Sequence, residues 1–208
     1  MALVPSAEAV GQAPDVAAAP TATLRAGPLV GVIQVDGALD EPAWQGAPET
    51  DALVAIEPNE GAAPSGRTVV RVLAGPKALV FGIRCEDPDA ARIVSYTKER
   101  DGDLDDEDHV ILVVDPFRDG LSGYVFAVNP GGARYDALVT GAGEMVNASW
   151  DGIWEAGTSR DALGWTAEIR IPIDSLSFAS GHEDWAFNVQ RRIQRLQETI
   201  RWASPNRD

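Results

Sequence analysis

Residues 67–87 read RTVVRVLAGPKALVFGIRCED, and they contain two apolar runs separated by the tripeptide Gly75-Pro76-Lys77. Val and Ile favour extended strands, whereas a Gly-Pro step interrupts a strand and favours a turn. The stretch therefore predicts a β-hairpin. Residues 119–140 repeat the pattern, with Asn129-Pro130-Gly131-Gly132 between two further runs. Two such hairpins indicate antiparallel sheets rather than alternating strands and helices.

Short apolar runs bounded by turn residues continue along the chain from Val30 onward. No segment longer than about ten residues has a 3.6-residue apolar period, so helices should be brief. We predict an all-β fold, a two-sheet antiparallel β-sandwich of the jelly-roll type, with about ten strands and one or two very short helices. The expected strands are residues 30–36, 67–74, 78–85, 109–115, 123–129, 133–140, 153–159, 164–171, 185–193 and 198–204.

Two short helical turns are expected. In residues 39–47, LDEPAWQGA, Asp40 can cap a helix, Pro42 suits the first helical position and Trp44 would point inward. The second turn is DSLSF, residues 174–178, with Asp174 as its cap.

Composition divides the chain into two parts. Residues 1–27 are rich in Ala and Pro and poor in large apolar side chains, which predicts a flexible leader or linker. With 45% hydrophobic residues, the chain can form a core, and we assign residues 28–208 to one sandwich domain. The N-terminal residues lack the basic start and Leu-rich stretch of a secretion signal.

The charge balance limits the partners. Seventeen Lys and Arg against 32 Asp and Glu give a formal net charge of −15, which disfavours binding to nucleic acid and to anionic lipid surfaces. No apolar stretch approaches the roughly 18 to 20 residues of a membrane helix, so we expect no direct membrane insertion. The single Cys85 cannot form an internal disulfide.

Motifs of nucleophilic, phosphate or zinc chemistry are missing from the sequence. There is no G-x-S-x-G, no Walker-type loop and no H-E-x-x-H. We therefore expect that the protein is not an enzyme. A carboxylate pair of the kind that hydrolyses glycosides is a weaker alternative, because Asp and Glu are abundant.

Residues 101–108, DGDLDDED, carry six acidic side chains directly before an apolar run. Acidic residues stand at the first, third and fifth positions, as in an EF-hand loop, but the sixth and twelfth positions are Asp106 and Leu112. An EF-hand is therefore excluded. Two interpretations remain: a solvated acidic turn that prevents strand pairing, or a looser structural calcium site. The candidate calcium ligands are Asp101, Asp103, Asp105, Asp106 and Asp108.

The tryptophans fall into two groups. Trp44, Trp165 and Trp185 lie in or beside apolar runs and are predicted core residues. Trp150 instead lies in a polar, turn-like segment. An aromatic ring on a loop can stack on a sugar ring while neighbouring polar groups bind its hydroxyls. The candidate ligand-binding residues are Trp150, Tyr96, Asn147 and Asp151.

The order of these segments resembles the family 9 carbohydrate-binding modules and their relatives. The resemblance rests above all on I-x-V-D-G at 33–37, on the following Trp44, and on G-W-T-A-E-I-x-I-P at 164–172, and it spans about residues 31–203. It implies a jelly-roll-like sandwich, calcium as a structural ion and, in sugar-binding members, glucan or xylan ends held between two tryptophans. Trp150 falls where one of these could lie, whereas the loop before residue 109 offers Tyr96 and no Trp.

Residues 114–136 and 185–208 are more similar to a subgroup of bacterial proteins in which this sandwich precedes a predicted outer-membrane β-barrel. That similarity implies an exported chain, periplasmic or associated with the outer membrane, covalently linked to a downstream barrel or enzyme domain. The leading hypothesis is a non-catalytic module that binds oligo- or polysaccharide. The alternative is a periplasmic interaction or gating domain of an outer-membrane protein, in which the sugar site has been lost.

Overall fold

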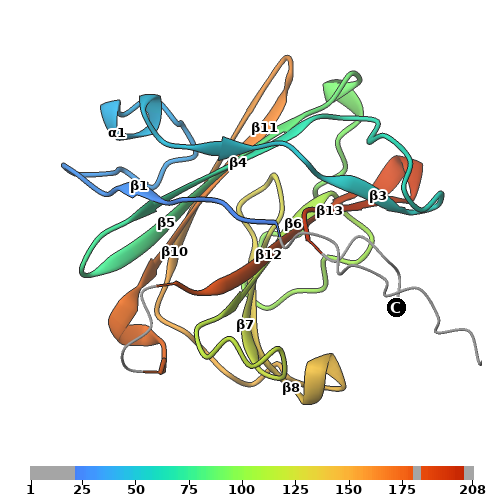
Figure 1. Ribbon diagram of the computed structural model, residues 1–208. Helices are drawn as coiled ribbons and strands as arrows, with labels where there is room; N and C mark the ends of the chain where they lie inside the picture. The colour runs from blue at the N-terminus through green and yellow to red at the C-terminus, as the bar shows by residue number, and fades with distance from the viewer. Residues whose placement is uncertain (1–21, 180–183, 204–208) are drawn as a thin grey trace, which may run out of the picture.

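The computed structural model describes residues 22–179 and 184–203, which form two sheets packed face to face (Figure 1). Among these residues there are 13 strands. Sheet A has the order β1-β4-β5-β11-β10, with β2 also paired to β4, and sheet B has the order β3-β13-β12-β6-β7-β8-β9. Only β1 and β4 pair in parallel among the described strands. The predicted antiparallel β-sandwich is confirmed.

The elements have the following bounds. Sheet A consists of β1 (Gly27–Pro28), β2 (Glu49–Thr50), β4 (Thr68–Ala74), β5 (Ala78–Glu86), β10 (Glu155–Asp161) and β11 (Gly164–Pro172). Sheet B consists of β3 (Val54–Glu57), β6 (His109–Asp115), β7 (Gly123–Val128), β8 (Arg134–Thr140), β9 (Met145–Asn147), β12 (Ala186–Ile193) and β13 (Glu198–Arg201). The helical elements are α1 (Pro42–Gln45) and the short 3-10 helices η1 (Ala90–Arg92), η2 (Gly141–Gly143), η3 (Ile173–Ser175) and η4 (Gln194–Leu196).

Both predicted hairpins are present. Strands β4 and β5 pair across residues 75–77, and β7 and β8 pair across residues 129–132. In the second turn the side chain of Asn129 accepts hydrogen bonds from the backbone N–H groups of Gly131 (3.0 Å) and Ala133 (2.9 Å). A side chain that bonds its own turn in this way favours the turn over other conformations, which is why the local sequence predicts it.

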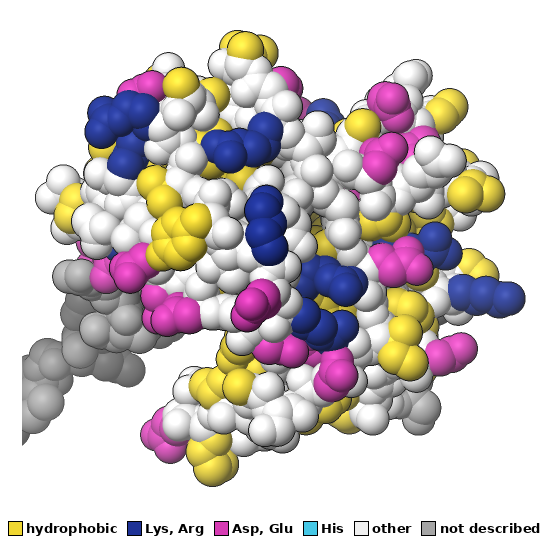
Figure 2. Space-filling view, turned by 180° about the vertical axis from the view of Figure 1, so that it is seen from behind, with side chains coloured by type: hydrophobic (Ala, Val, Ile, Leu, Met, Phe, Trp, Pro, Cys, Tyr) yellow, Lys and Arg dark blue, Asp and Glu magenta, His cyan; other side chains and the backbone are white. Residues whose placement is uncertain are grey.

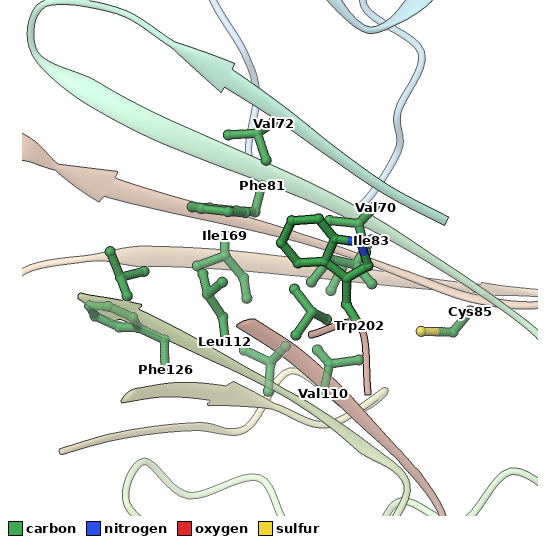
Figure 3. Close-up of a cluster of buried hydrophobic side chains, with 14 of the residues drawn as sticks. Val70, Val72, Phe81, Ile83, Cys85, Val110, Leu112, Phe126, Ile169 and Trp202 are labelled. Atoms are coloured by element: carbon green, nitrogen blue, oxygen red, sulfur yellow. The ribbon is translucent and has the colours of Figure 1, made fainter. Parts of the chain in front are cut away.

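The inward-facing side chains of the two sheets form one core (Figure 3). Val70 and Ile83 of sheet A and Val110 and Leu112 of sheet B are all fully buried in the same cluster. Burying each such side chain contributes roughly 1.5 to 3 kcal/mol. Trp165 is also fully buried in this core, as predicted.

Residues 30–36, which are predicted as a strand from their short apolar run, are not a strand. Val30 and Val32 are 61% and 81% exposed. The segment belongs to a loop that crosses the outer face of sheet A. There the carboxylate of Glu168 accepts hydrogen bonds from the backbone of Gly37 (2.9 Å) and from Nε1 of Trp44 (3.1 Å). The backbone of Asp36 and Gly37 bonds to this side chain instead of to a neighbouring strand, so the apolar run by itself predicted the wrong structure.

The helical turns differ from the predictions in their bounds. Helix α1 is shorter than residues 39–47, and its N-cap position is occupied by Glu41, without a side-chain cap, rather than by Asp40. Trp44 is buried, as predicted. In η3, Asp174 lies in the first turn rather than at the cap.

Part of the predicted leader can be described. Residues 1–21 lie outside the described residues, whereas Leu24 packs against the core and Gly27 begins β1. None of the helices in the described part of the chain has the length and apolar character needed to cross a bilayer.

Charged side chains of both signs lie side by side on the face shown in Figure 2, with hydrophobic side chains scattered among them. Ion pairs among the described residues include Arg84–Asp161 (2.8 Å) and Arg67–Asp51 (2.8 Å). Exposed pairs contribute little to stability, typically about 0 to 1 kcal/mol each.

Candidate binding site around the acidic loop

The acidic loop, residues 95–108, precedes β6 and carries most of the residues predicted to bind a ligand or a metal. Two pockets adjoin it and share Gly102 and Asp103. The Tyr96 pocket, about 510 Å³, is lined by Tyr96, Thr97, Lys98, Glu99, Gly102, Asp103 and Asp106. The His109 pocket, about 390 Å³, is lined by loop residues 101–105 and by His109, Ile111, Val125, Ala127 and Tyr135 from the strands.

Glu107 anchors the start of the acidic loop. Its buried carboxylate accepts hydrogen bonds from the backbone N–H groups of Tyr96 (2.7 Å) and Thr97 (2.9 Å) and from Nδ2 of Asn129 (2.9 Å). Burial alone would raise the pKa of Glu107, but these hydrogen bonds outweigh it and lower the pKa below its ordinary value. The carboxylate therefore stays ionised and holds the backbone of the loop in place.

Asp108 is buried as well, unlike the other four candidate calcium ligands, which are exposed. Its Oδ2 atom accepts a hydrogen bond from the backbone N–H of Val94 (2.9 Å), and its Oδ1 atom has no hydrogen-bond partner among the described residues. Burial raises the pKa of Asp108. Asp108 therefore supports the base of the loop from the interior.

The exposed aspartates have separate partners. Asp101 pairs with Arg100 (3.6 Å), Asp103 accepts a hydrogen bond from the backbone N–H of Asp105 (2.9 Å), and Asp106 accepts one from Gln194 (3.4 Å). Within residues 22–179 and 184–203, no three His, Cys, Asp or Glu side chains are grouped so that they could hold a metal ion. The carboxylates of the described residues are thus not grouped around one point, and calcium binding, which can also use backbone carbonyls, stays a prediction.

Trp150 is partly buried and packs against the core. Its ring centroid lies 5.1 Å from that of Tyr124 and 6.0 Å from that of Phe126. Aromatic pairs at these separations stabilise one another beyond the area they bury. Much of the Trp150 ring is therefore engaged in packing.

The remaining predicted ligand residues are distributed around the loop. Asp151 is exposed and forms an ion pair with Arg100, and Asn147 accepts a hydrogen bond from the backbone N–H of Ser149 (3.1 Å). Tyr96 is 63% exposed and lines the Tyr96 pocket. Of the four predicted residues, Tyr96 alone lines either of these two pockets in the described structure.

The structure adds residues that the sequence analysis did not single out. Lys98 lines the Tyr96 pocket and donates a hydrogen bond from Nζ to the carbonyl of Gly131 (3.1 Å). His109 begins β6, as predicted, but it also lines the second pocket together with Tyr135. The alternation of β6 carried a signal for His109, because every second residue from His109 points away from the core formed by Val110 and Leu112.

The fold is that of the family 9 carbohydrate-binding modules, so the predicted resemblance is confirmed for the fold. A family 9 module from Caldicellulosiruptor kristjanssonii in complex with cellotriose matches with a TM-score of 0.59 and 16% identity, over 84% of this chain and 86% of that one. A structure of a family 9 module from the same organism in complex with glucose matches with a TM-score of 0.59 and 13% identity, over 86% and 89% of the two chains. A candidate carbohydrate-binding protein from Bacteroides uniformis ATCC 8492 matches with a TM-score of 0.61 and 15% identity, over 76% and 78%. No family model and no curated protein matches the sequence.

Proposed function

We propose that this domain is a non-catalytic carbohydrate-binding module and that its sugar site is the Tyr96 pocket. The observation that carries the proposal is the position of Tyr96, a largely exposed aromatic ring beside a pocket with polar walls. Two structures with this fold contain cellotriose or glucose, which supports a saccharide as the ligand.

The chemistry of the pocket suits a neutral sugar. The face of the Tyr96 ring can stack on the C–H face of a pyranose, and Lys98 can donate hydrogen bonds to its oxygens. Glu99, Asp103 and Asp106 can accept hydrogen bonds from its hydroxyls. An apolar surface combined with both donors and acceptors is typical of small-molecule sites.

The loop segment that carries Tyr96 is fixed by hydrogen bonds in the absence of a ligand. Glu107 binds the backbone N–H groups of Tyr96 and Thr97, and Asn129 donates a hydrogen bond to the carbonyl of Thr97 (2.9 Å). A loop fixed in this way loses less conformational entropy on binding, which favours affinity.

Calorimetric titration with cello- and xylo-oligosaccharides tests the proposal. We expect binding in the native protein and its loss in Tyr96→Ala. Phe178→Ala is the matched control, because Phe178 is an exposed aromatic residue that lines neither pocket. The absence of binding across a broad glycan array, or unchanged binding by Tyr96→Ala, would overturn the assignment.

A second candidate function is that of an interaction domain, such as the periplasmic or gating domain that the sequence similarity implies. The observation that favours it is the edge strand β9 of sheet B, where Met145 and Val146 are 63% and 58% exposed. Open strand edges with apolar side chains pair readily with other chains. Loss of partner binding on Val146→Lys, in a protein without sugar affinity, would support this function. Export and a linked downstream barrel or enzyme domain remain predictions from the sequence.

A further inference from the structure

The His109 pocket lies on the face of sheet B that points away from the core. Its floor is formed by one row of residues across three paired strands, in which Ile111 of β6 lies opposite Ala127 of β7, and Ala127 lies opposite Tyr135 of β8. Val125 completes the floor. The acidic loop provides the wall, so the pocket combines an apolar base with a charged side.

His109 lines this pocket and has one ring nitrogen without a hydrogen-bond partner among the described residues. The side chain is 7% exposed, and its Nδ1–H donates to the carbonyls of Leu104 and Glu107, each at 3.0 Å. A carbonyl can only accept, so Nδ1 carries the proton, and in the neutral ring Nε2 carries the lone pair. No described residue forms a hydrogen bond with Nε2, so this acceptor is free for a ligand.

The other polar groups of the pocket are also acceptors. Asp101, Asp103 and Asp105 line it, and no Lys or Arg is among the described residues that do. The Tyr135 hydroxyl is the exception, because a phenol O–H group can donate as well as accept a hydrogen bond. Two basic groups act on lining residues without lining the pocket themselves: Arg100 pairs with Asp101 (3.6 Å), and Arg192 acts electrostatically on His109.

This arrangement disfavours an anionic ligand and a bare metal ion. A uronate or phosphate would meet carboxylates without a compensating cation. A metal ion needs several ligands at about 2.0 to 2.6 Å from one point, and no three suitable side chains are so grouped in the described residues. Hydrogen-bond acceptors at several separate positions of a pocket suit a ligand that carries several separate hydrogen-bond donors. At about 390 Å³ the pocket falls in the range of small-molecule sites, roughly 300 to 1,000 Å³.

We propose that the His109 pocket binds an amino sugar, a hexosamine unit with a free, protonated amine. The ammonium group lies against the carboxylates of the loop, with Asp105 central, and a ring hydroxyl donates to Nε2 of His109. The C–H face of the ring lies on Ile111 and Val125. The choice of a sugar rests on the carbohydrate-binding function proposed above, whereas the selectivity for a cation rests on this pocket alone.

A comparison of matched tetrasaccharides tests the proposal. Titrations in mildly acidic buffer use the tetramers of glucosamine, of N-acetylglucosamine and of glucose. The first two differ in acetylation, which removes the charge. We expect the glucosamine tetramer to bind at least about tenfold more tightly than the acetylated one, and its binding to weaken as salt screens the charges.

Variants separate this pocket from the Tyr96 pocket. Asp105→Asn should weaken glucosamine binding about tenfold or more, and Tyr135→Phe should weaken it less. Asp40→Asn is the matched control, since Asp40 is an exposed acid that lines neither of the two pockets. Tyr96→Ala should abolish binding of the glucose tetramer and leave that of the glucosamine tetramer unchanged, so the two proposals can fail separately.

Three results would overturn the amino-sugar site. The first is equal affinity for the glucosamine and N-acetylglucosamine tetramers. The second is the same effect of Asp105→Asn and Asp40→Asn. The third is binding of a simple amine such as ethanolamine as tight as that of glucosamine, which would show attraction to charge without recognition of the sugar ring.

Discussion

The buried carboxylate of Glu107 accepts a 2.7 Å hydrogen bond from the backbone N–H of Tyr96, whose own side chain is 63% exposed. A buried acid thus fixes the backbone of the aromatic residue on which the proposed sugar platform depends. This hydrogen bond connects a residue in the interior of the sandwich with a residue of the candidate site. It also means that the site can be weakened without changing any group that faces the ligand.

Glu107→Gln should lower both stability and sugar affinity. Gln has no charge and fewer acceptors, so the charge-assisted bonds to the backbone weaken, at a cost of roughly 1 to 3 kcal/mol. Urea unfolding measures the first effect, and titration with cello-oligosaccharides measures the second. Glu99→Gln is the control for stability, since Glu99 is exposed. Equal stability of the two variants would contradict the anchoring role of Glu107.

Glu168 makes stability depend on pH. Burial, with the nearby Glu41, raises its pKa from 4.5 to about 7, although its hydrogen bonds act in the opposite direction. The folded state therefore binds this proton more tightly than the unfolded chain does. This contribution to stability is complete below about pH 4.5 and is lost as the pH rises through about 7, and its size is on the order of 3 kcal/mol.

Urea unfolding between about pH 5 and 8 tests this expectation. The difference between the native protein and Glu168→Gln isolates the titration of Glu168, because other groups titrate in both. The native protein should lose stability relative to the variant as the pH rises. Parallel stability curves for the two proteins would exclude the effect.

Trp150→Ala should destabilise the protein by about 2 kcal/mol or more, because the ring packs against Tyr124 and Phe126. Trp150→Phe keeps an aromatic ring in the cluster and should cost less. Thermal unfolding compares the two variants. If Trp150→Phe stays folded yet loses sugar affinity, Trp150 belongs to the binding site that the sequence predicted. Retained affinity leaves it a packing residue.

Removal of calcium tests the other prediction for the acidic loop. An ion present at about 100 times its Kd stabilises the folded state by about 2.7 kcal/mol. Bound calcium therefore predicts a lower Tm in EDTA, its recovery when calcium is added, and a smaller response in Asp103→Asn. An identical melting curve with and without EDTA would leave the solvated acidic turn as the better interpretation.

Much of the fold could be predicted because its signals are local. The hairpin turns at 75–77 and 129–132 depend on neighbouring residues, and the alternation of β6 reflects the two faces of one strand. The strand predicted at residues 30–36 is not present because that prediction also used only local signals. The short apolar run there suits a strand, but the segment bonds to Glu168, more than a hundred positions away in the sequence.

The candidate site was less predictable. The sequence by itself determined a β-sandwich and an acidic loop before β6, because strand propensity, turn chemistry and charge act over a few residues. Only the tertiary structure decided that Glu107 and Asp108 turn inward, that Trp150 packs on the core, and that His109 and Tyr135 share a pocket. The physical reason is that strand pairing and burial bring distant residues together, and their chemistry depends on those neighbours.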